Sequence, residues 1–116
     1  MQTITRNIGD FDDLNFEVDL TEYGKTGADV DDIFFVVKKN VDDTSYLLEK
    51  KESLAEISYS GSTTLTVLVQ WSETEYSNFN EDESYIAGLY IKFTGDPVAD
   101  LHTKQDFKLE LKKRVL

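Results

Sequence analysis

The stretch that most constrains the fold is Thr64–Trp71, Thr-Leu-Thr-Val-Leu-Val-Gln-Trp. Apolar side chains occupy every second position, and only Leu68 breaks the alternation. A period of two with β-branched residues predicts a strand with one buried face. Trp71 is the only tryptophan of the chain, and we expect it at the base of the core. The apolar stripe consists of Leu65, Val67, Val69 and Trp71.

Other segments also read as strands. Leu14–Leu20 alternates without a fault, and Tyr85–Phe93 and Phe107–Leu111 each place apolar residues along one face. Ile33–Val37 is an unbroken apolar run whose short length and residue types predict a central strand. Burying both of its faces requires a second layer or a subunit contact. Shorter candidates are Ile4–Ile8, as an edge strand, Tyr46–Lys50 and Leu54–Tyr59.

Two local signals modify this series of strands. Ser72 followed by Glu75 forms a capping box, which predicts a helical turn within Ser72–Phe79. Gly88 interrupts the second face of its strand, which predicts a bulge or a close backbone approach.

About seven to eight short strands, one short helical turn and no long helix define the expected fold. The pattern is typical of an all-β, immunoglobulin-like antiparallel β-sandwich. At 116 residues, we expect one domain spanning residues 1–116.

The amino-acid composition disfavours several classes of binding partner. The net charge is −11, and an acidic surface disfavours nucleic acid and anionic membranes because phosphate binding requires cations. No apolar run is long enough to span a bilayer, and the N-terminal residues lack an apolar signal region. The chain has no cysteine, which excludes disulfides and thiolate metal sites.

The charge is unevenly distributed. Residues 104–116 carry five Lys/Arg against two Asp/Glu. The acidic body is first of all a solubility feature. The sharper alternative is that the basic end, at Lys112, Lys113 and Arg114, docks onto the acidic surface of a neighbouring copy.

The candidate chemical sites are weak. His102 is the only histidine, and no nucleophile motif accompanies it. The acidic segments 10–13 and 29–32 could supply oxygen ligands to Ca²⁺, but Asp also favours loops by bonding to its own backbone. No spacing of acids indicates a glycosidase pair. We therefore predict no catalytic residue, no metal site and no cofactor.

Surface side chains offer two binding hypotheses. Phe34, Val36 and Leu68 are apolar residues on the face opposite the main core stripe of their strands, so they are candidates for an interface. Three tyrosines could instead form a platform on which sugars stack, but we favour the interpretation that each covers an edge of the core with its hydroxyl in water. These tyrosines are Tyr46, Tyr59 and Tyr90.

The order of these pieces resembles small β-sandwich modules of tailed bacteriophages, notably the N-terminal domain of upper baseplate proteins and similar tail-fibre attachment modules. The likeness extends over nearly the whole chain, with Glu83 standing where the family pattern has glycine. Such modules are non-enzymatic and build oligomeric virion parts, so the resemblance implies a structural role. The matching pieces are Arg6 with Gly9-Asp10, Phe16–Leu20, Tyr23-Gly24, Asp32–Lys38, Leu48–Lys50, Leu65–Val69, Ser72–Phe79 and Ser84–Phe93.

We therefore expect a non-enzymatic virion structural protein, such as a tail, baseplate, neck or head-fibre component. It would be assembled in the bacterial host cytoplasm and would contact copies of itself and other virion proteins, as a homo-oligomer. The alternative is a carbohydrate- or cell-surface-binding β-sandwich module. A hydrolase is the third hypothesis.

Overall fold

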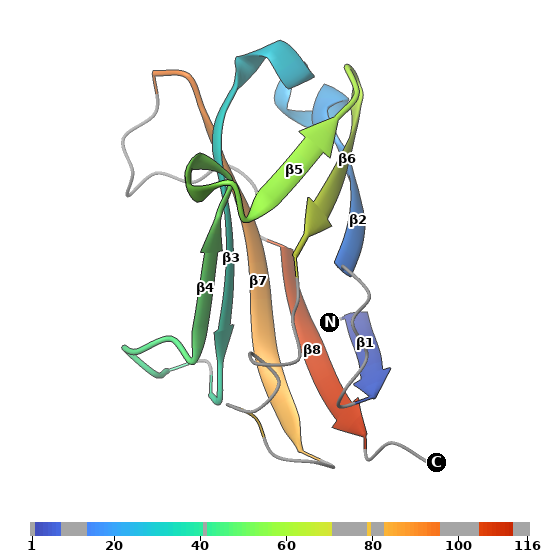
Figure 1. Ribbon diagram of the computed structural model, residues 1–116. Helices are drawn as coiled ribbons and strands as arrows, with labels where there is room; N and C mark the ends of the chain where they lie inside the picture. The colour runs from blue at the N-terminus through green and yellow to red at the C-terminus, as the bar shows by residue number, and fades with distance from the viewer. Residues whose placement is uncertain are drawn as a thin grey trace.

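The computed structural model describes residues 2–7, 14–40, 42–70, 79, 83–95 and 105–112. Within them the chain forms two β-sheets (Figure 1). The strands are β1 (Gln2–Asn7), β2 (Leu14–Asp19), β3 (Val30–Lys38), β4 (Leu48–Lys51), β5 (Ile57–Ser60), β6 (Thr64–Val69), β7 (Ser84–Phe93) and β8 (Gln105–Lys112). Three single 3₁₀ turns accompany them: η1 (Leu20–Tyr23), η2 (Gly27–Asp29) and η3 (Glu52–Leu54).

The strand order confirms the predicted fold class. One sheet runs β1-β8-β7-β3-β4 and the other β2-β6-β5. All described pairings are antiparallel except β1 with β8, which is parallel. β2, β6 and β5 occupy the places of immunoglobulin strands B, E and D, while β8, β7, β3 and β4 occupy those of G, F, C and C′. The fold is an all-β, immunoglobulin-like sandwich.

The inner faces of the two sheets form the core. Along β2 and β6 the apolar residues are buried at every second position, as the alternation predicts. Phe16 of β2 bridges the layers, with its ring centroid 5.8 Å from that of Phe35 on β3 and 5.0 Å from that of Phe107 on β8. Ile33, Phe35 and Val37 are fully buried, so the odd-numbered face of β3 is the core face.

Backbone contacts fix one end of the sandwich. The Gly27 N–H donates to Ser62 O at 2.8 Å, and the Leu20 N–H donates to Thr63 O at 2.9 Å. A Cβ on Gly27 would lie 2.1 Å from the carbonyl oxygen of Gly61. The loop between β2 and β3 is therefore held against the β5–β6 turn, and only glycine allows so close an approach.

The exposed edge at β4 carries a lysine that points inward. Lys50 pairs with core residue Phe35 across the β3–β4 ladder and is only 8% exposed. Its ammonium lies 3.7 Å from the Glu56 carboxylate. An inward charge on a short edge strand opposes the addition of another strand.

Several predicted boundaries change. Strand β6 ends at Val69, and Trp71 lies outside the described residues, as does most of the predicted turn Ser72–Phe79. Phe79 is described: it is buried and packs edge-on against Tyr85 at 4.9 Å. The fourth strand begins at Leu48 rather than Tyr46, and Leu54 belongs to η3 rather than to β5.

Candidate interaction groove

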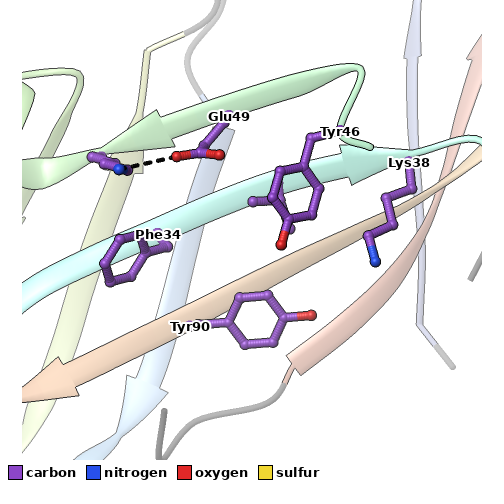
Figure 2. A pocket seen from close by; sticks show the side chains of 7 residues that line it. Phe34, Lys38, Tyr46, Glu49 and Tyr90 are labelled. Atoms are coloured by element: carbon purple, nitrogen blue, oxygen red, sulfur yellow. Dashed lines mark ion pairs between the residues drawn. The ribbon is translucent and has the colours of Figure 1, made fainter. Parts of the chain in front are cut away.

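A groove of about 350 Å³ lies on the outer face of the five-stranded sheet (Figure 2). Its floor is β3, where Phe34, Val36 and Lys38 take the even-numbered, outward positions. The register sets Phe34 beside Tyr90 of β7 and Lys51 of β4. We call this outer surface of β3, β4 and β7 the groove face. Its lining residues are Phe34, Val36, Lys38, Tyr46, Glu49, Lys51 and Tyr90.

Gly88 shapes the groove. It pairs with Val36 in the β3–β7 ladder, and a Cβ there would lie 2.4 Å from Oη and 2.7 Å from Cζ of Tyr90. The Tyr90 ring thus folds back over the space that a side chain at position 88 would fill. The predicted close approach is real, but it involves a side chain, and the register irregularity lies between Val30 and Asp32 instead.

Tyr46 forms the opposite wall. The Leu47 N–H donates to Val37 O at 2.7 Å, which anchors the segment before β4 beside the end of β3. Figure 2 shows the Tyr46 ring reaching over β3 toward Lys38 and Tyr90. Tyr46 remains 49% exposed, so its ring is available to a partner.

The cations of the groove lie close to its aromatic rings. The Lys38 ammonium is 5.2 Å from the Tyr46 ring centroid, and that of Lys51 is 5.7 Å from the Phe34 centroid. Both distances suit cation–π attraction. Lys51 also pairs with Glu49 at 3.1 Å (dashed line in Figure 2). Across the described side chains, no carboxylate forms a salt bridge with Lys38, so an acidic partner could pair with it.

The outer surface of the three-stranded sheet, on the opposite side of the sandwich, is mostly polar, unlike the groove face. Its cross-strand pairs set Asn15 and Ser58 on either side of Leu68. Leu68 is 37% exposed and is the one large apolar side chain among these outward residues. We call this surface the polar face; its residues are Asn15, Glu17, Asp19, Ser58, Ser60, Thr64, Thr66 and Leu68.

Two hydrogen-bonded pairs outside the groove shift the pKa of one of their members, Asp19 in the first and Lys39 in the second. Hydrogen bonds from the hydroxyl and then the backbone N–H of Thr21 lower the pKa of Asp19. The Glu83 carboxylate, which accepts a hydrogen bond from Lys39 at 2.8 Å, raises the pKa of that lysine. Both pairs are solvent-exposed.

The acidic residues of segment 29–32, considered as calcium ligands, form hydrogen bonds and an ion pair with other residues. Asp29 accepts a hydrogen bond from the Thr26 N–H at 2.9 Å, Asp31 pairs with Lys92, and Asp32 accepts from the N–H groups of Ile33 and Ser53. No group of three acids or histidines that could hold a metal exists among the residues described. The 10–13 segment and His102 lie outside them.

The groove lining contains a single carboxylate, Glu49, whereas a glycosidase needs a pair.

The structure separates the predicted interface residues. Phe34 and Val36 share the groove, but Leu68 belongs to the other sheet and faces away from them. Lys112 is in β8, where it pairs with Asn7, while Lys113 and Arg114 lie outside the described residues. Of the three tyrosines, Tyr46 and Tyr90 meet in the groove. Tyr59 does not join them: it is partly buried and packs against the core from β5, as its alternative interpretation expects.

Lys38, Glu49 and Lys51 line the groove but were not predicted as site residues. The sequence marks them only as charges at strand ends and at an edge. The alternation along β3 could have found Lys38, because it continues the outward face of Phe34 and Val36. Lys51 and Glu49 follow only from the register with β3, which the sequence does not show.

Comparison with known proteins assigns no relative. No family model matches the chain, and no curated protein matches its sequence. Among the residues that the structure describes, no helix is long and apolar enough to cross a membrane. The fold and the groove face therefore carry the functional argument.

Proposed function

We propose that this protein is a non-enzymatic structural component of a phage virion that works by docking its groove face onto other protein surfaces. The observation that carries the proposal is the groove itself. Aromatic and apolar side chains occupy outward positions of β3 and β7, although the core of the sandwich is already complete on their inner faces.

Local charge supports docking at this surface. The molecule carries a net charge of −11, which makes two copies repel one another. On the groove face, in contrast, Lys51 pairs with Glu49, and Lys38 has no acidic partner among the described side chains. Aromatic residues are enriched at the buried centre of protein interfaces, whereas polar residues form the rim.

The resemblance of the strand pattern to tail and baseplate sandwich modules supplies the virion part of the proposal. Such modules form tail, baseplate, neck or head-fibre parts. Their role needs an interface and no catalytic group.

The test is direct detection in particles. Mass spectrometry of purified virions from the source phage should find this protein in a fixed ratio to the major capsid protein. A phage-encoded non-structural enzyme is the control for carry-over. Absence from purified particles would contradict the proposal, as would a position of the gene far from the head and tail genes.

A second candidate is carbohydrate binding, because the Tyr46 and Tyr90 rings share the groove with the Lys38 ammonium. Aromatic faces stack on sugar rings, and polar groups fix their orientation. A glycan array with the wild type and Tyr46→Ser tests this function. Binding that depends on Tyr46 would support it, and an array without signal would remove it.

A further inference from the structure

Two apolar features lie on opposite outer surfaces of the sandwich, one hollow and one raised. The hollow is the groove, walled by Phe34, Tyr46 and Tyr90. The raised feature is Leu68, on the central strand of the three-stranded sheet with the shorter Asn15 and Ser58 beside it. The volume of the groove, about 350 Å³, exceeds that of a leucine side chain.

The two surfaces also differ in charge. Along the polar face Glu17 and Asp19 are exposed, and its described outward positions hold no lysine or arginine. Glu17 lies diagonally across the β2–β6 ladder from Leu68. The groove offers Lys38 and Lys51 on either side of its apolar floor. Lys51 already pairs with Glu49, so Lys38 is the lysine of the groove that has no acidic partner among the described side chains. An acidic surface with one protruding leucine therefore complements a hollow with Lys38 at its edge.

A two-fold contact of groove on groove fits less well. It would set two hollows against each other and bring Lys38 and Lys51 of both copies together. Flat sheets can approach to about 10 Å when their side chains interdigitate, which requires a raised group opposite a hollow. The polar face supplies that group and the groove face does not.

We propose that the partner of the groove is a second copy of this chain, whose Leu68 seats between Phe34 and Tyr90 while its Glu17 approaches Lys38. The inference rests on the proposed function and names the partner of the same surface. The contact joins different surfaces of the two copies, so it is heterologous. One copy of the pair keeps a free polar face and the other keeps a free groove face, so the contact propagates into a ring or a filament.

Sedimentation velocity on the full chain across a range of concentrations tests the contact. Wild type should form species that grow with concentration. Leu68→Lys and Lys38→Glu should each weaken association about tenfold or more, the change expected from loss of a central interface contact. Leu54→Lys is the matched control, because Leu54 is 65% exposed but lies in η3 and belongs neither to the groove lining nor to the polar face. Circular dichroism and thermal melting verify that each variant is folded.

Mixing the variants distinguishes this contact from a two-fold one. Lys38→Glu retains Leu68 and Leu68→Lys retains the groove, so an equimolar mixture should form dimers that grow no further. A mixture that stays monomeric, or a Leu68→Lys protein that associates like wild type, would overturn the inference.

The result also separates the two proposals. Association that is lost with Lys38→Glu but kept with Leu68→Lys overturns the leucine contact and leaves docking by the groove face standing. A monomeric wild type at all concentrations overturns self-association, whereas absence from purified particles overturns the virion role.

Discussion

The groove face and the polar face lie on opposite sides of one shared core, yet they meet solvent differently. On the polar face, outward residues are short or charged, and Leu68 is isolated. On the groove face, the same alternation along β3 places Phe34 and Val36 outward, and Val36 is only 7% exposed. Because Ile33, Phe35 and Val37 fill the core from β3, the outward-facing Phe34 and Val36 are not required for it. This difference is why we assign binding to the groove face.

The largest expected change in the free energy of unfolding comes from a comparison of two adjacent residues of β3. Phe35→Ala removes a fully buried ring and should lower the free energy of unfolding by about 3–5 kcal/mol. Phe34→Ala removes a half-buried ring of the groove and should cost clearly less. Urea denaturation of both variants measures the pair. Equal losses would mean that Phe34 belongs to the core and that the groove face has no separate role.

The next test compares the apolar residues of the two faces. Val36→Thr places a hydroxyl beneath the groove side chains and should cost roughly 1–3 kcal/mol. Leu68→Thr exchanges a 37% exposed side chain beside polar neighbours and should stay within about 0.5 kcal/mol. Chemical denaturation at a concentration where both variants are monomeric gives the comparison. A larger loss for Leu68 would reverse the proposed contrast between the faces.

The effect of Gly88→Ala on stability should depend on whether the Tyr90 ring is present. Gly88→Ala drives a methyl into the Tyr90 ring and should destabilise by roughly 1 kcal/mol, as overpacking does. In a Tyr90→Ser background the same change should be neutral or stabilising by about 0.5–1 kcal/mol, because alanine restricts the unfolded chain more than glycine does. A double-mutant cycle measures the coupling. Destabilisation of equal size in both backgrounds would show that the Tyr90 ring does not occupy this space.

The smallest effect concerns the polar face at low pH. Hydrogen bonds from Thr21 lower the pKa of Asp19 in the folded protein. This contribution to stability is therefore complete above the unfolded pKa, about 3.9, and is lost as the pH falls through the lower folded value. Thr21→Val should move the pKa of Asp19 back toward its ordinary value, measured by NMR titration of the carboxyl group. An unchanged titration would exclude the Thr21 hydroxyl as the main cause.

Sequence periodicity predicts the strands well, because burial of one face imposes a period of two wherever a strand covers the core. It therefore located β2, β6 and β7 and gave Phe34 and Val36 their outward positions. Periodicity does not reveal which strands are neighbours. The groove depends on Tyr90 standing beside Phe34 and on Gly88 facing Val36, and both follow from the register between β3 and β7. For the same reason Leu68 was grouped with Phe34, although the two belong to different sheets.

The parallel pairing of β1 with β8 has a consequence for how the chain reaches its fold. It joins the two ends of the described chain, from Gln2 beside Phe107 to Asn7 beside Lys112. Closing a long loop costs entropy before any contact compensates for it, and pairings distant in sequence slow folding. Among the described strands β1 is synthesised before the others, yet its partner β8 is synthesised after them. The larger sheet is therefore completed only once β8 has been translated.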